Sequence, residues 1–102
     1  MSSKIAIIAK IRSAPGKRDE LSKEFQSAFH NVEDEPGTLT YILHEDTKDE
    51  DTLWFYETYT DQAAMEAHGK AEWMKALGPK LGPLMGGRPE LTFLKPVGGK
   101  GL

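Results

Sequence analysis

Segments with strand periodicity and segments with helix periodicity follow one another in an order that restricts the fold more than any other feature of the chain. Alternating apolar side chains predict strands over residues 4–12, 38–44, 52–59 and 90–95. Apolar spacings of three and four predict one helix over residues 17–32, and a second that begins after Thr60 or Asp61, is interrupted at Gly69 and ends before Gly78-Pro79. This β-α-β-β-α-β order predicts an α+β fold of the ferredoxin-like type, in which a four-stranded antiparallel sheet carries both helices on one face.

The other face of such a sheet is left without helices. If the helices cover the odd-numbered strand residues, then Ile8, Ile42, Trp54 and Tyr56 point away from them. Apolar surface of this extent is unusual on a monomer, and a second copy packing sheet against sheet would bury it. We therefore expect a homodimer in which the two sheets form a dimeric α/β barrel.

The composition excludes several classes of function. The chain of 102 residues has the size of one domain, which we assign to residues 1–97, followed by a flexible glycine-rich tail over residues 98–102. A net charge of −3 argues against nucleic-acid and anionic-membrane partners, because both require a basic face. The absence of cysteine removes disulfides, thiolate metal sites and cysteine nucleophiles. We expect a cytoplasmic protein, since the sequence contains neither a membrane span of ~20 apolar residues nor a segment typical of a signal peptide.

Two candidate acid–base groups lie close together in the predicted fold. Glu57 stands inside an aromatic-rich strand, where glutamate is uncommon, and His68 follows on the next helix. Each also has a purely structural explanation: Glu57 could pair with a lysine or arginine at a sheet edge, and His68 could lie near a helix C-terminus, which favours positive charge. If Glu57 lies beneath the helices, its carboxyl group must be hydrogen-bonded or have a raised pKa.

Aromatic residues surround these two groups. The simplest explanation is a packed core, but a flat organic ligand between helices and sheet would contact the same rings. The five residues are Phe25, Phe29, Tyr41, Phe55 and Trp73. We predict no metal site, because the acidic segment over residues 44–51 lacks the glycine and the terminal glutamate of a calcium loop. The sequence also carries no dinucleotide fingerprint, flavin motif or serine-elbow motif.

Four short motifs occur in a fixed order along the chain. They are Pro15-Gly16-Lys17, Glu35-Pro36-Gly37 leading to Tyr41, Phe55-Tyr56-Glu57, and Ala63, Ala64 and His68 on the second helix. In these motifs and their spacing the sequence resembles the antibiotic biosynthesis monooxygenase family, small dimeric ferredoxin-like proteins that include quinol monooxygenases. The resemblance covers about residues 4–95.

The resemblance implies that the protein oxidises a quinol or polyphenol with molecular oxygen and without metal, flavin or heme as cofactor. In this chemistry a deprotonated phenol is itself the reductant, so the protein has to supply a base, hydrogen-bond donors and a dry apolar cavity. The resemblance assigns His68 as the base or proton relay and Glu57 as the group that orients or tunes it. The cavity lining would then come from Tyr41, Trp73, Phe55 and the phenylalanines of the first helix, Phe25 and Phe29.

Relatives with other activities keep further interpretations open. Heme-degrading members use an asparagine, a tryptophan and a heme-ligating histidine where this chain has Ala9, His68 and about Gly78, so heme degradation is not expected. Other members isomerise small hydroxyketones. The alternatives to an oxygenase are therefore an isomerase of this kind and a non-catalytic protein that binds small ligands or is associated with stress.

Overall fold

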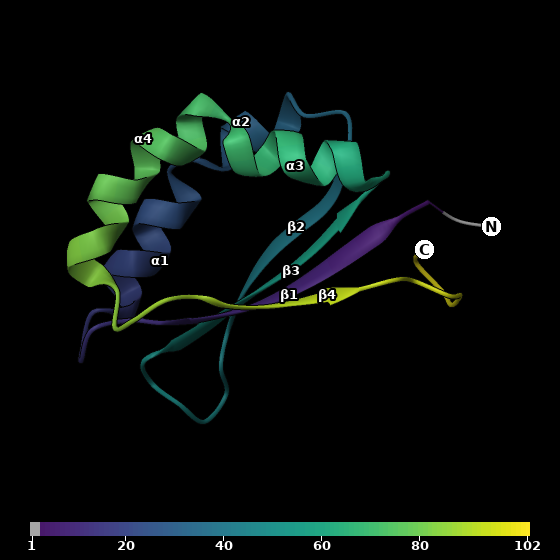
Figure 1. Cartoon of the computed structure of the whole chain (residues 1–102). Coiled ribbons are helices and arrows are strands. Elements are labelled where there is room, and N and C mark those ends of the chain that lie inside the picture. The colour runs from purple at the N-terminus through teal and green to yellow at the C-terminus, as the bar shows by residue number, and fades with distance from the viewer. Residues whose placement is uncertain (1–2) are drawn as a thin grey trace.

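The computed structural model describes residues 3–102 and confirms the predicted order of elements (Figure 1). The strands are β1 (Ile5–Arg12), β2 (Thr38–Glu45), β3 (Thr52–Tyr59) and β4 (Glu90–Leu94). The helices are α1 (Arg18–Gln26), α2 (Phe29–Glu33), α3 (Gln62–Lys70) and α4 (Glu72–Leu81), and a short 3-10 helix, η1 (Gly82–Leu84), follows α4. Among the helices of this described part, none is both long and apolar enough to cross a membrane.

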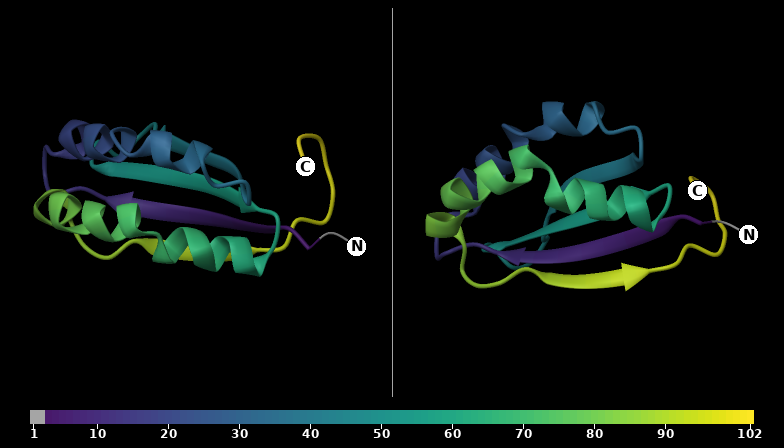
Figure 2. Two further views of the ribbon diagram at one scale, coloured as in Figure 1. Left: turned by 90° about the horizontal axis from the view of Figure 1, so that it is seen from above. Right: turned by 45° about the horizontal axis from the view of Figure 1, so that its top comes forward.

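The four strands form one antiparallel sheet in the order β2-β3-β1-β4. All four α-helices lie on one face of this sheet, in two rows formed by α1 with α2 and by α3 with α4 (Figures 1 and 2). The architecture is the predicted ferredoxin-like α+β fold, with β1 and β3 as the central pair and β2 and β4 at the edges.

The hydrophobic core lies between the sheet and the helices. Odd-numbered side chains of the central strands face the helices, as predicted, and Ile7, Ile11 and Phe55 are among those buried there. Leu21 of α1 and Leu77 of α4 pack onto them from above. Period-two alternation in the strands and the apolar stripes of the helices therefore produce one common core.

The opposite face of the sheet has no helices. Ile42 and Tyr56, which are neighbours across β2 and β3, remain 49% and 40% exposed there. Trp54 lies on the same face but is half-buried, because its indole N–H donates to Asp46 at 2.8 Å and the Lys10 ammonium lies 5.6 Å from its ring. The prediction that these side chains point away from the helices is confirmed.

The first predicted helix is not continuous, which corrects the sequence-based expectation for residues 17–32. It ends at Gln26 and resumes as α2 at Phe29. The Ser27 hydroxyl donates to the Glu24 carbonyl, and the Asn31 side-chain amide donates to the Ala28 carbonyl. Serine and asparagine side chains compete with helical hydrogen bonds in this way, which explains a break within an otherwise regular apolar stripe.

The second predicted helix is also divided, but not where expected. Asp61 caps it by accepting from the Ala64 N–H at 2.8 Å, whereas Gly69 lies inside α3 and the break falls at Ala71, whose backbone is extended (φ −59°, ψ 142°). Helix α4 then continues beyond Gly78 and includes Pro79 in its last turn. The expectation of a stop at Gly78-Pro79 was wrong.

Gly37 marks the point where the start of β2 and helix α3 come closest. A Cβ atom built at this glycine would overlap the Cβ of Ala64 and lie 3.3 Å from the Thr60 hydroxyl oxygen. Its carbonyl accepts the Thr60 N–H at 2.9 Å. Glycine is needed here for space and not for an unusual φ angle, since the positive-φ glycines of the described chain lie elsewhere.

Replacing Gly37 with alanine is expected to lower the free energy of unfolding by about 1–3 kcal/mol, the usual cost of overpacking. In an Ala64→Gly background the same substitution should cost much less, because the overlapping methyl group is gone. Gly78→Ala is the matched control: a Cβ there meets no atom within 4 Å, so it should stabilise α4 by about 0.5–1 kcal/mol. Urea denaturation measures all five proteins, including Ala64→Gly alone, and a Gly37→Ala variant as stable as the parent would contradict this close approach.

Candidate active site

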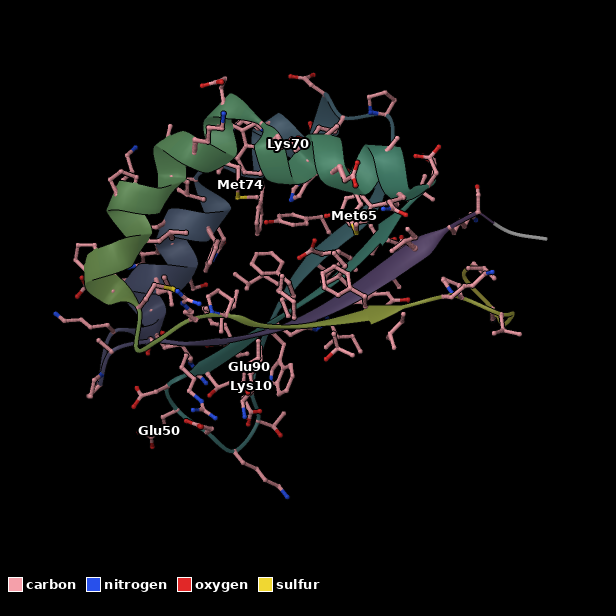
Figure 3. The ribbon with its side chains drawn as sticks, viewed as in Figure 1. Lys10, Glu50, Met65, Lys70, Met74 and Glu90 are labelled. Carbon is pink, nitrogen blue, oxygen red and sulfur yellow. The ribbon has the colours of Figure 1, made fainter. Side chains whose placement is uncertain are left out.

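A cavity of about 400 Å³ lies between the helices and the helix-facing side of the sheet. Residues of α1, α3 and α4 cover it, and residues of all four strands line its floor. Met65 of α3 and Met74 of α4 lie on the sheet side of their helices, facing this space (Figure 3). The volume falls within the range of small-molecule sites, which is about 300–1,000 Å³.

The lining is apolar except for a few titratable groups. These groups are Tyr41, Glu57, Tyr59 and His68, and no lysine or arginine is among the described residues that line the cavity. His68 and Glu57 are both buried, with exposed fractions of 6% and 8%. Both candidate acid–base groups are therefore at the same cavity, as the sequence analysis expected.

A single carboxylate holds the histidine in place. His68 Nδ1 lies 2.8 Å from Glu35 Oε1, and the indole N–H of Trp73 donates to Glu35 Oε2, also at 2.8 Å. The Thr38 hydroxyl donates to Oε1 at 2.9 Å. Although partial burial acts to raise the pKa of Glu35, the hydrogen bonds from His68, Trp73 and Thr38 outweigh it and hold the pKa below its ordinary value.

The breaks in the helices explain how these groups meet. Glu35 stands in the turn between α2 and β2, and His68 is in the last turn of α3. The extended residue Ala71 then redirects the chain, so that Trp73 in the first turn of α4 reaches the other oxygen of the same carboxylate. Three separate segments of the chain therefore position one imidazole ring.

Glu57 has a different partner from the one that the sequence analysis gave it. We expected Glu57 to orient His68, but its carboxyl oxygen Oε1 accepts a hydrogen bond from the Tyr59 hydroxyl, and Glu35 is the residue bonded to His68. Burial raises the pKa of Glu57, and this effect exceeds the lowering by the Tyr59 hydrogen bond and by the charge of His68. Burial likewise raises the pKa of Tyr41 and Tyr59, so both keep their hydroxyl protons at neutral pH.

Three of the five aromatic residues expected at the site line the cavity. Tyr41 stacks on Phe55 with ring centroids 4.5 Å apart, and Phe25 meets Phe55 edge to face at 5.0 Å. Phe29 contacts Tyr41 and Phe55 but does not line the cavity, and Trp73 serves as a hydrogen-bond donor to Glu35. The expectation that Phe29 and Trp73 line the cavity is therefore corrected.

Glu35 was not predicted to be a site residue, and its Glu-Pro-Gly motif entered only as one of the four motifs of the family resemblance. Its contacts with His68 and Trp73 span 33 and 38 residues of sequence, so no local periodicity could reveal them. The one available signal was an acidic residue directly before a Pro-Gly turn that leads to a cavity strand. Within residues 3–102 there is no group of three or more histidine, aspartate or glutamate side chains that could hold a metal ion.

Glu35→Gln is expected to lower the free energy of unfolding by about 1–3 kcal/mol at pH 7, because an amide cannot accept both N–H donors. The lowered pKa of Glu35 means that its contribution is complete above pH 4.5 and is lost as the pH falls through the lower value of the folded state. The difference between variant and parent should therefore shrink below pH 4.5.

Thermal unfolding followed between pH 7 and acidic pH measures this difference. Glu33→Gln, a change at an exposed glutamate of the neighbouring helix α2, is the control and should alter stability little at any pH. A difference between Glu35→Gln and the parent that does not depend on pH would show that the carboxylate charge is not what holds His68 and Trp73.

Similarity to known proteins agrees with this fold. Residues 4–78 match the family described as antibiotic biosynthesis monooxygenase. The protein named "Putative monooxygenase YcnE" of Bacillus subtilis (strain 168) is 35% identical over 66 residues, which are 65% of this chain and 70% of that protein. Protein sll1783 of Synechocystis is 23% identical over 91 residues, and the match spans 89% of this chain but only 62% of the length of that relative.

Solved structures give the same result. A Caulobacter crescentus CB15 protein that carries the family's name superimposes with a TM-score of 0.89 at 31% identity, covering 95% of this chain and 92% of that one. PA3566 from Pseudomonas aeruginosa superimposes with a TM-score of 0.85 at 28% identity, covering 96% and 98%. With its family motifs, its ferredoxin-like fold and a cavity between helices and sheet, this chain belongs to the antibiotic biosynthesis monooxygenase family.

Proposed function

We propose that this protein is a cofactor-independent monooxygenase that oxidises a quinol or polyphenol-type aromatic substrate with molecular oxygen. The observation that carries the proposal is the His68 imidazole, which is bonded to Glu35 through Nδ1 and lines an apolar cavity of about 400 Å³. Membership of a family named for monooxygenases supports the same reaction class.

The first step is removal of the phenolic proton. With the Nδ1 proton donated to the Glu35 carboxylate, Nε2 is the ring nitrogen that can accept a proton from a ligand in the cavity. A phenol has a pKa of about 10, so a neutral imidazole shares its proton as negative charge leaves the oxygen. The Glu35 carboxylate stabilises the imidazolium that forms, and Tyr41 keeps a hydroxyl proton with which it can bind the substrate oxygen.

The second step is oxidation of the resulting anion by dioxygen. The substrate supplies all the electrons: conversion of the quinol to a quinone yields one pair, and replacement of a ring C–H by C–O yields the other. One oxygen atom enters the product and the other leaves as water, so a para-hydroquinone and dioxygen give a hydroxyquinone and water. The protein has to bind, deprotonate and desolvate the substrate, and it does not have to provide a reductant.

The aromatic wall serves substrate binding in this proposal. Tyr41, Phe55 and Phe25 offer adjoining ring faces and edges to a flat molecule, and the thioethers of Met65 and Met74 face the same space. Methionine adapts to ligands of different outline because its side chain is unbranched and polarisable. A planar substrate would therefore exchange contact with water for contact with apolar side chains on both of its faces.

Removal of the base tests this proposal. His68→Ala should lower the rate of oxygen uptake with a hydroquinone by about 10²–10⁴-fold, the contribution of a general acid–base group. Free imidazole should restore part of the rate, because it can occupy the space that the side chain leaves. His30→Ala, a change at an exposed histidine of α2, should keep the activity of the parent. Assays belong below the unfolding temperature of His68→Ala, since this variant also loses the Glu35 contact.

Two outcomes would contradict the monooxygenase assignment. Full activity in His68→Ala would remove His68 from the reaction. Binding of hydroquinones by the parent protein without any oxygen uptake or product would instead identify a ligand-binding protein.

The proposed enzyme acts as a homodimer in which a second copy covers the helix-free face of the sheet. Ile42, Tyr56 and Leu94 leave an apolar patch there, with exposed fractions of 49%, 40% and 41%. The patch lies on the open face of the sheet. Two copies of the same twisted sheet can pack face to face about a two-fold axis.

Ile42→Lys is expected to convert the dimer to a monomer, because it would bury a charge in an apolar interface. This position is a better choice than Trp54, whose indole is also bonded to Asp46 within one chain. Gln26→Lys, on the helical layer, is the control and should remain dimeric. Light scattering after size-exclusion chromatography at micromolar concentration gives the masses, and a monomeric parent protein would refute the dimer.

A further inference from the structure

We propose that Glu57 determines the ligand specificity of the cavity. Its free carboxyl oxygen accepts a hydrogen bond from a second donor group of the ligand, so that the cavity binds uncharged aromatic molecules with two hydroxyl groups and rejects aromatic carboxylates. The inference rests on the proposed function, since it names the substrate class of the same site. It gives Glu57 a role in binding that neither the family match nor the contact between His68 and Glu35 assigns.

The surroundings of Glu57 contain no permanent positive charge. It faces the helices from the middle of β3, between Ile7 of β1 and Tyr41 of β2. None of the salt bridges among residues 3–102 includes Glu57. A buried carboxyl group without an ion-pair partner is costly and has to be explained by other hydrogen bonds.

Only one of its two oxygens has a partner in the described chain. Oε1 accepts from the Tyr59 hydroxyl, and no hydrogen bond to Oε2 is present. The fully buried side-chain polar atoms without a partner among the described residues are Arg18 Nε and Thr52 Oγ1, so Oε2 keeps accessible surface. Because the residue as a whole is 8% exposed and lines the cavity, that surface faces the cavity.

Tyr59 places the two recognition groups at one end of the cavity. Its hydroxyl is bonded to Glu57, and its ring centroid lies 5.5 Å from that of His68. Glu57 and His68 therefore both lie next to Tyr59, and the charge of His68 acts on the Glu57 carboxyl group. An aromatic ring with hydroxyl groups at two positions can reach both, one to Nε2 of His68 and the other to Oε2 of Glu57.

Charge separates the ligands that fit from those that do not. The described cavity lining holds no lysine or arginine, and its one basic group, His68, is already bonded to the Glu35 carboxylate. An aromatic acid would bring a second negative charge next to Glu57 in an apolar space, where opposite charge is needed to offset the loss of hydration. A neutral hydroxyl group donates to the same oxygen without this cost.

Three ligands of matched shape test the proposal: a naphthalenediol, its monomethyl ether and the corresponding hydroxynaphthoic acid. Binding is measured calorimetrically without oxygen, so that no turnover is needed. The parent protein should prefer the diol over the ether by about 10-fold or more, since a hydrogen bond to a charged group is worth ~1.5–3 kcal/mol. It should bind the acid more weakly than either.

Glu57→Gln keeps the size of the side chain and an oxygen for Tyr59, but it removes the charge. The preference for diol over ether should fall to about threefold or less, because the amide can donate to the ether oxygen, and the acid should bind about 10-fold more tightly than to the parent. Glu33→Gln is the matched control, since it makes the same change at an exposed glutamate of α2 outside the cavity, and it should retain the ligand order of the parent. Circular dichroism and thermal unfolding verify that each variant is folded.

The order of affinities decides the outcome. Unchanged ratios among the three ligands in Glu57→Gln, or a parent protein that binds ether and acid as well as the diol, would overturn the role of Glu57. Oxygen uptake is scored separately: selective anaerobic binding with no oxidation would refute the monooxygenase and leave the specificity role standing. Oxidation without discrimination between the ligands would refute the specificity role of Glu57 and leave the monooxygenase standing.

Discussion

The carboxylate of Glu35 is the contact on which the geometry of the site depends. It accepts hydrogen bonds from the start of β2, the end of α3 and the start of α4, through Thr38, His68 and Trp73. Without it, two ring N–H groups near the cavity would lose their acceptor, and each unpaired buried donor costs about 1–3 kcal/mol. The same contact joins the two helix rows to the sheet at the place where the imidazole meets the cavity.

Local pattern was sufficient to predict the fold but not the breaks within its helices. Strand alternation and helical stripes are properties of neighbouring residues, so the four strands and their order followed from sequence alone. The break at Ala71 did not, because alanine favours helix; the extended backbone there lets His68 and Trp73 reach the same carboxylate, a contact that local pattern does not reveal. Gly69 was predicted to interrupt the helix but lies inside α3, and a Cβ atom built there would meet no atom within 4 Å.

The candidate site was likewise predictable only in part. His68 and Glu57 could be named from their residue types and their place beside an aromatic strand, whereas the pairing of each with its partner could not. Tyr59 lies two residues from Glu57 on the same strand face, so their contact is local. Sequence alone still does not show that Glu57 accepts from Tyr59 and not from another donor. Glu35 was visible only as part of a short family motif, since its contacts with His68 and Trp73 join segments more than 30 residues apart.

The two carboxyl groups near His68 have pKa values shifted in opposite directions, lowered at Glu35 and raised at Glu57. Hydrogen bonds from three donors keep Glu35 ionised, and so it can hold and stabilise a charged imidazole. Burial raises the pKa of Glu57, which makes its carboxylate a stronger hydrogen-bond acceptor than an exposed one. The carboxylate outside the cavity thus holds the imidazole, whereas the carboxyl group of Glu57 lines the cavity itself. Tyr59 contacts the ring of His68 and donates its hydroxyl proton to Glu57, so a single buried side chain connects the two titratable groups of the cavity.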